Sequence, residues 1–157
     1  MEQVYKYEIL PMKENKYWYI NDLTDNLRPQ DRDELSQLGV TDIHKEIADS
    51  VRASDEAYVA VDNSGKVIVM YGVIRREPGG QIWCLGTGRF NEFKKSFVCS
   101  CMVVLKKWRA IYDTLWNYVA KSNTLSIRWL GTYGASFDKG YMKNGNEFWK
   151  FTIGGER

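Results

Sequence analysis

The chain has 157 residues, of which 44% are apolar and 27% are charged, and a net charge of +2. This length predicts a single domain over residues 1–157 with its own hydrophobic core. The near-neutral charge argues against a protein that binds nucleic acid over its whole surface. No apolar run approaches the roughly 20 residues that cross a bilayer, and no signal peptide opens the chain. We therefore expect a cytoplasmic protein with neither membrane nor nucleic acid among its partners.

The three cysteines, Cys84, Cys99 and Cys101, have the spacing of neither a metal site nor a disulfide framework. Each lies in an apolar segment, where a reduced cysteine behaves as a small hydrophobic residue. The only histidine, His44, lies off the apolar stripe of its predicted helix, which favours a solvent-facing role. The sequence therefore predicts no metal site.

The first third of the chain predicts two short strands and then two helices. Aromatic-rich strands are expected at residues 5–10 and 17–20. The first helix has Pro29 in its first turn and Gly39 at its C-terminal cap, followed by a second helix capped by Thr41. The buried stripe of this second helix consists of Ile43, Ile47 and Val51.

The middle of the chain predicts a three-stranded antiparallel meander. Strands at residues 57–62 and 66–75 flank the turn Asn63-Ser64-Gly65, and Pro78-Gly79-Gly80 leads into a third strand at residues 81–87. Gly72, inside the middle strand, indicates a bulge or a close backbone approach.

The remainder predicts a helix at about residues 94–109, a strand at 115–120, a short helix at 124–133 and a final hairpin. Asn123 or Ser122 caps the short helix. The hairpin strands lie at residues 136–141 and 147–153. This order predicts an α/β fold with a mixed, mainly antiparallel sheet and helices on both of its faces.

The stretch from residue 81 to residue 97 carries the first hint of function. An apolar strand breaks at Gly86-Thr87-Gly88 and leads to a helix that begins with Lys94 and Lys95. Lysines at a helix start oppose the helix dipole unless an anion is bound nearby. A strand, a small-residue break and a helix N-terminus suit a phosphate group.

The element order resembles that of the GNAT superfamily of N-acetyltransferases. Four stretches are similar to small GNAT-like proteins of short-tailed bacteriophages, some described as internal virion proteins and others as acetyltransferase-like proteins that act on the host. These stretches are N-L-R-P-Q-D-R-D-E-L (26–35), D-I-H-K-E-I-A-D-S (42–50), I-W-C-L-G-T (82–87) and L-W-N-Y-V-A-K-S-N-T-L-S-I-R-W-L-G-T-Y-G-A (115–135). The resemblance implies a protein of the host cytoplasm or of the virion.

The resemblance also implies a site for acetyl-CoA or another acyl-CoA. The strand residues Trp83, Cys84, Leu85 and Gly86 would line the pantetheine arm of the cofactor. The residues implied to face its phosphates are Thr87, Gly88, Lys94, Lys95 and Ser96. Asn123 would contact the cofactor arm while also capping its helix.

The sequence departs from the family pattern at the catalytic positions. Residues 89–93 lack the usual glycines of the diphosphate loop, and Leu130 stands near the position of the usual tyrosine acid. Tyr133 and Ser136 are the remaining candidates for a catalytic role. Acyl transfer to an amine can proceed mainly by positioning, so an N-acetyltransferase is still expected.

Two functions follow from the sequence. The first is an acetyl-CoA-dependent N-acyltransferase that acts on a host protein or a small amine. The alternative is a catalytically weak or inactive GNAT scaffold that acts as an interaction protein, either associated with the virion or binding and inhibiting a host factor. The surplus of aromatic residues, 14% of the chain, also suits a homo-oligomer surface.

Overall fold

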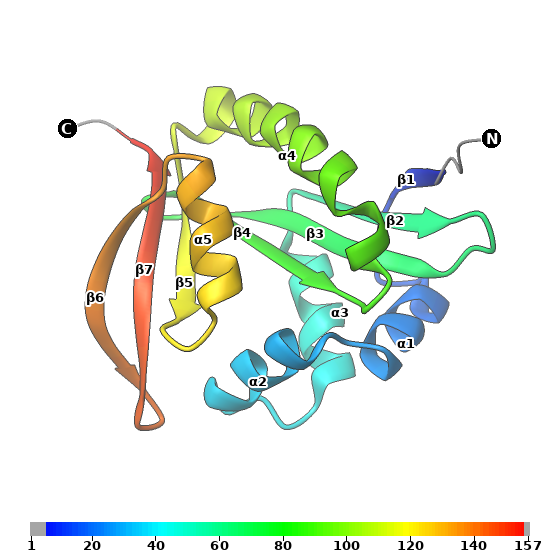
Figure 1. The fold of residues 1–157 in the computed structure, drawn as a ribbon, viewed down its shortest axis with the longest axis horizontal. Coiled ribbons are helices and arrows are strands. Elements are labelled where there is room, and N and C mark those ends of the chain that lie inside the picture. Colours follow the sequence, from blue (N-terminus) through cyan, green and yellow to red (C-terminus); the bar gives the residue numbers. More distant parts are fainter. Residues whose placement is uncertain (1–5, 156–157) are drawn as a thin grey trace.

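The computed structural model describes residues 6–155, which fold around a seven-stranded sheet with the order β1-β2-β3-β4-β5-β7-β6 (Figure 1). The strands are β1 Tyr7–Pro11, β2 Glu56–Asp62, β3 Val67–Arg76, β4 Gly79–Gly86, β5 Thr114–Ala120, β6 Ser136–Lys143 and β7 Asn146–Gly154. The helices are α1 Tyr17–Asp25, α2 Pro29–Gln37, α3 Ile43–Ala53, α4 Phe90–Tyr112 and α5 Thr124–Thr132. All neighbouring strands are antiparallel except β4 and β5, which are parallel.

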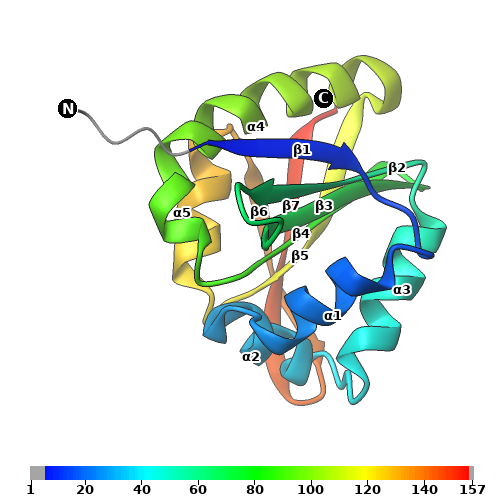
Figure 2. The ribbon, with the colours of Figure 1, turned by 90° about the vertical axis from the view of Figure 1, so that its right-hand side faces the viewer.

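Helices cover both faces of the sheet, as the sequence predicts. Helices α1, α2 and α3 lie on one face, and α4 and α5 lie on the other (Figure 2). The first face is filled by a core that includes Ile20, Leu23 and Ile47. The opposite face is filled by two clusters, one around Trp108 and Leu115 and the other around phenylalanines of α4. The α/β class with a mixed, mainly antiparallel sheet is confirmed.

The predicted meander is present as β2, β3 and β4. Gly65 in its first turn has φ +78°, a conformation that favours glycine. A Cβ at Gly72 would lie 2.8 Å from the Glu56 carbonyl oxygen and 2.8 Å from Trp83 Nε1, so this glycine marks a close approach. The register shift between β2 and β3 lies instead at Ala60 and Val61.

Two predictions for the N-terminal region are wrong. Residues 17–20 begin α1 and are not a strand, because Ile20 and Leu23, one helical turn apart, are both fully buried. Tertiary packing therefore overrides the strand preference of the aromatic run. The cap of α3 is Asp42 and not Thr41, because Asp42 Oδ1 accepts a hydrogen bond from Lys45 N. Residue 5 of the first predicted strand lies outside the described residues.

The predicted start of α4 is also wrong by about one turn. The helix begins at Phe90, because Phe90, Phe93 and Phe97 have helical spacing and are all buried. Lys94 and Lys95 therefore lie in the second turn, where both are exposed. The predicted cap of α5 is confirmed: Asn123 Oδ1 accepts a hydrogen bond from Ser126 N.

Candidate functional site

The parallel strands β4 and β5 enclose a gap in the sheet. They pair only at Gly80↔Leu115 and Gln81↔Trp116, and beyond these positions the strands diverge (Figure 1). Their carboxyl ends therefore lie apart, and side chains from both faces of the sheet can reach the space between them. Here we call this space the β4–β5 gap.

A cavity of about 440 Å³ passes through the β4–β5 gap. This volume lies within the range of small-molecule sites, roughly 300–1,000 Å³. Its lining includes Trp83, Cys84 and Leu85 of β4, Phe97 and Cys101 of α4, Trp129 of α5, and Tyr133 directly after α5. On the opposite face it reaches Leu35 and Glu46. The structure therefore brings together three of the predicted pantetheine residues in one cavity.

Register determines which backbone groups face the gap. Thr87 N donates to Ile68 O of β3, so every second residue of β4 is turned toward β3. Cys84 lies in the alternate set, and its N–H and C=O point into the gap. Across the gap, Lys121 N donates to Glu147 O of β7, so the Tyr118 backbone points toward β4. A ligand between the strands would meet the Cys84 peptide, whereas Tyr118 N already donates to the Asn117 side chain.

At its closed end the gap is bridged by the Asn117 side chain. Asn117 Nδ2 donates to Ile82 O at 2.7 Å, and its Oδ1 accepts from Tyr118 N at 2.7 Å. Gln81 Nε2 donates to the same Oδ1 at 3.0 Å. A neutral side-chain amide therefore joins the edges of the two strands where their ladder ends.

At its open end the gap is bridged by α2. Asp31 Oδ2 accepts from Gly86 N at 2.8 Å, and Arg28 N donates to Gly86 O at 2.9 Å. Arg28 and Asp31 also form an ion pair at 2.9 Å, and they are only 7% and 5% exposed. The backbone of Gly86, predicted to line a cofactor arm, is thus bonded to the chain itself.

One turn further along α2, Glu34 reaches the other strand. Glu34 Oε2 accepts from Ala120 N and from Asn123 Nδ2, both at 3.0 Å. Because Asn123 Oδ1 caps α5, both polar atoms of this side chain are engaged within the chain. Helix α2 therefore spans the open end: Asp31 is hydrogen-bonded to β4, and Glu34 is hydrogen-bonded to β5. We call Arg28, Asp31 and Glu34 the α2 clamp.

Burial is the main influence on the pKa values of the two carboxylates of the α2 clamp. Burial raises the pKa of Asp31, and the Arg28 charge and the Gly86 hydrogen bond oppose this only in part. Burial also raises the pKa of Glu34 against the hydrogen bonds from Asn123 and Ala120. In the sequence, Asp31 and Glu34 lie near a helix start, where acids complement the helix dipole. Their contacts with β4 and β5 leave no local signal in the sequence.

Most amides of the turn from β4 to α4 are bonded within the chain, including Arg89 N, which donates to Thr87 Oγ1 at 3.3 Å. The N–H groups of Phe90, Asn91 and Glu92 donate to the carbonyls of the turn that precedes them. Thr87 is fully buried, and its Oγ1 donates to Val67 O at 2.8 Å. Gly88 lies exposed in the turn.

The remaining predicted phosphate residues lie on the surface of α4. Lys94 and Lys95 are exposed, and Ser96 Oγ forms a hydrogen bond of 2.8 Å with Tyr7 Oη of β1. Arg89, at the start of the helix, pairs with Asp22 of α1 at 2.9 Å. Lys94, Lys95 and Ser96 do not line the cavity, and their contact with the diphosphate of a coenzyme A stays a prediction.

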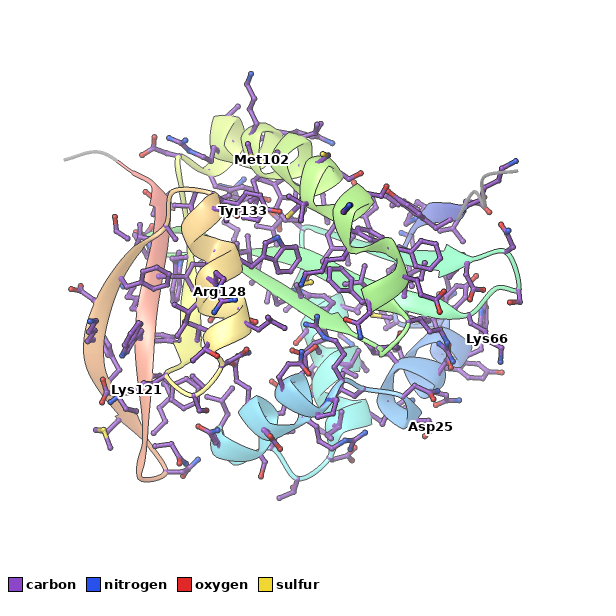
Figure 3. The ribbon with its side chains drawn as sticks, in the orientation of Figure 1. Asp25, Lys66, Met102, Lys121, Arg128 and Tyr133 are labelled. Atoms are coloured by element: carbon purple, nitrogen blue, oxygen red, sulfur yellow. The ribbon has the colours of Figure 1, made fainter. Side chains whose placement is uncertain are left out.

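Of the two catalytic candidates, only Tyr133 lines the cavity, beside α4 (Figure 3). Its Oη donates to Val98 O at 3.1 Å and accepts from Trp129 Nε1 at 2.7 Å. Burial raises the Tyr133 pKa above its ordinary range, so the phenol keeps its proton. Ser136 is exposed on β6 and does not line the cavity.

The cavity thiols are poor nucleophiles. Cys84 is exposed at the cavity, and desolvation by the surrounding protein raises the pKa of its thiol to about 12. Burial also raises the Cys101 pKa. Within residues 6–155 no cluster of three or more His, Cys, Asp or Glu side chains is arranged to hold a metal ion. No helix in that range is long and apolar enough to cross a membrane.

Solved structures with the same arrangement are N-acetyltransferases. A chimera built on the spermidine N-acetyltransferase SpeG of Vibrio cholerae aligns with a TM-score of 0.66 at 12% identity, covering 94% of this chain and 95% of that one. The ribosomal-protein-S5-alanine acetyltransferase of Vibrio fischeri aligns with a TM-score of 0.66 at 14% identity, covering 97% of each chain. The chain has the GNAT fold. At such identities the likeness extends to the fold alone and assigns no substrate to this chain.

Sequence comparison points to a bacteriophage relative of this GNAT-fold chain. The family described as "Bacteriophage T7, probable scaffold protein Gp13" matches residues 73–142. The probable scaffold protein gp13 of Escherichia phage T7 is 41% identical over 73 residues, which is 46% of this chain and 49% of that protein. The chain thus matches about half the length of its relative. The matched segment runs from β3 into β6 and contains both walls of the β4–β5 gap.

Proposed function

We propose that this chain is a bacteriophage protein that uses the GNAT fold as a scaffold for protein–protein contacts in the virion, without acyl-CoA chemistry. The observation that carries the proposal is the α2 clamp. Asp31 and Glu34 occupy backbone groups at the open end of the β4–β5 gap, where the resemblance implied a cofactor arm. Asn117 occupies further groups at the closed end.

The start of α4 supports the same proposal. Its first amides are bonded to the preceding turn, and buried phenylalanines fill the place of the glycines that would admit a diphosphate. The bacteriophage relative supports the assignment to the virion, since that protein bears the name of a probable scaffold protein. Together these features suit a fold that functions through contacts of its surface and not through a bound cofactor.

Quantitative mass spectrometry of purified particles of the encoding phage tests the proposal. We expect the chain in particles at a fixed copy number, and particles made without its gene should show an assembly or infectivity defect. Its presence only in the soluble host lysate would contradict the proposal. A control protein of the lysate measures carry-over into the particle fraction.

A second candidate function is an acyl-CoA-dependent N-acyltransferase of a host protein or small amine. The observation in its favour is the cavity, which leaves the Cys84 peptide facing the gap. Incubation with radiolabelled acetyl-CoA, host lysate and spermidine tests it. Label transferred above a heat-denatured control would favour this candidate, and it would need to fall when Tyr133 is replaced by Phe.

A further inference from the structure

The solvent face of α4 carries a second side-chain stripe, opposite the one that packs on the sheet. Its residues recur at spacings of three and four, which places them on one line along the helix. They are Lys95, Cys99, Met102, Lys106 and Arg109, with Val103 and Ala110 beside them. All of them are exposed. The stripe runs for about 20 Å, at 1.5 Å per residue.

The centre of this stripe is apolar. Met102 is 53% exposed and Val103 is 70% exposed, and Cys99 lies one turn before them. Met102 lies midway along α4, on the outermost layer of the molecule (Figure 3). A surface helix of a globular protein normally keeps apolar residues on one face only. An apolar centre with a polar rim is the composition of a protein interface.

The rim of the stripe is basic. Helix α4 contains five basic residues, Lys94, Lys95, Lys106, Lys107 and Arg109, against the single acid Glu92. Lys107 lies 3.7 Å from Glu56 and is partly neutralised within the chain. The remaining cations flank the apolar centre at both ends, so charge complementarity requires an acidic partner.

We propose that this stripe docks an acidic amphipathic helix of another protein of the virion. The inference rests on the proposed function. It is supported by the match with the probable scaffold protein, because residues 73–142 include the whole of α4. An antiparallel second copy centred on Met102 would set Lys95 against Arg109, so like charges oppose self-association through this face. DNA or RNA would be bound by the basic rim alone, so a nucleic acid does not account for the apolar centre.

Fluorescence anisotropy with synthetic peptides tests the docking chemistry. The probe is a labelled helical peptide of three heptads with leucine along one stripe and glutamate beside it. We expect it to bind the wild-type protein. Val103→Glu should weaken binding at least about tenfold, because it places a carboxylate in the desolvated centre. Lys95→Ala/Lys106→Ala should weaken binding and flatten its salt dependence.

Two controls separate specific docking from simple charge attraction. Leu125→Glu, a similar change at a 42% exposed residue of α5, should leave binding unchanged. A scrambled peptide of the same composition should bind at least about tenfold more weakly, because its apolar stripe is lost. Equal binding of both peptides, or no effect of Val103→Glu, would overturn the proposal. So would preferential binding to anionic phosphatidylglycerol vesicles or duplex DNA.

Incorporation into phage particles distinguishes this inference from the proposed function. We expect the Val103→Glu protein to be depleted from particles and the Leu125→Glu protein to be packaged normally. Normal packaging of both variants would reject docking through α4 while leaving a virion role intact. Absence of the wild-type chain from particles would reject the proposed function itself.

Discussion

The two ends of the β4–β5 gap are bridged by opposite kinds of chemistry. At the closed end, the neutral Asn117 amide joins strands that still lie side by side. At the open end, the α2 clamp consists of the buried Arg28–Asp31 ion pair and the half-buried Glu34 carboxylate. The difference indicates that a neutral amide suffices where the strands are close, whereas an inserted helix with charged side chains is needed where they diverge.

Substitutions at the charged, open end should also destabilise the fold more than substitutions at the closed end. A buried ion pair adds little net stability, but removing one partner leaves an uncompensated charge. A lost neutral hydrogen bond costs less, and water in the adjacent cavity can replace part of it. Substitutions at the two ends should therefore differ in how much stability they remove. Only the contribution of the charged end to stability should depend on pH.

The largest effect is expected for Asp31→Ala. The change leaves the Arg28 guanidinium buried without its partner and Gly86 N without its acceptor. The free energy of unfolding should fall by about 3–5 kcal/mol in urea denaturation. Asp33→Ala, at an exposed position of the same helix, should change it by less than about 0.5 kcal/mol. A loss below about 1 kcal/mol for Asp31→Ala would show that the clamp does not hold the open end.

Glu34→Ala should have the next largest effect. It removes one carboxylate oxygen that serves both Ala120 N and Asn123 Nδ2. We expect a loss of about 2–3 kcal/mol, since two buried donors lose their acceptor. Hydrogen exchange should also quicken at the Ala120 amide, measured by NMR. Unchanged exchange at that amide would contradict the bridge to β5.

Asn117→Ala should cost less, about 1–2 kcal/mol, because the groups it leaves, Ile82 O and Tyr118 N, can reach cavity water. Urea denaturation measures the difference. A loss as large as that of Asp31→Ala would remove the distinction between the two ends.

The smallest effect is a pH dependence carried by Glu34. Its folded-state pKa is raised by burial, so the folded protein binds this proton more tightly than the unfolded chain. The stability of the wild type relative to Glu34→Gln should therefore fall as pH rises from about 4.5 through the raised pKa. Urea denaturation at a series of pH values measures this slope. Asn117→Ala, which removes no ionisable group, should show a flat difference, and a wild-type advantage that grows with pH would contradict the burial argument.

Much of the fold could be predicted because its signals are local. Pro29 and Gly39 mark the ends of α2, Gly65 marks the first hairpin, and Asn123 marks the start of α5. The start of α4 was misplaced because the phenylalanines that extend it are helical only in the context of their burial. For the same reason the aromatic run that opens α1 was mistaken for a strand.

The candidate site was predicted only in part because its decisive contacts are long-range. Asp31 and Gly86 are 55 positions apart, and Glu34 and Ala120 are 86 positions apart. A local reading of α2 shows only acids near a helix start, which is a common and sufficient explanation for them. The β4 residues Trp83, Cys84 and Leu85 do line the cavity, whereas their contact with a pantetheine arm stays a prediction.

Thermal unfolding with and without acetyl-CoA tests most directly whether the chain's own side chains occupy the positions of the cofactor arm. We predict no change in melting temperature at millimolar acetyl-CoA for the wild-type protein. Binding at about 100 times the dissociation constant would instead add about 2.7 kcal/mol of stability. A stabilisation of that size by acetyl-CoA, absent with adenosine diphosphate alone, would contradict the account and restore the acyltransferase function.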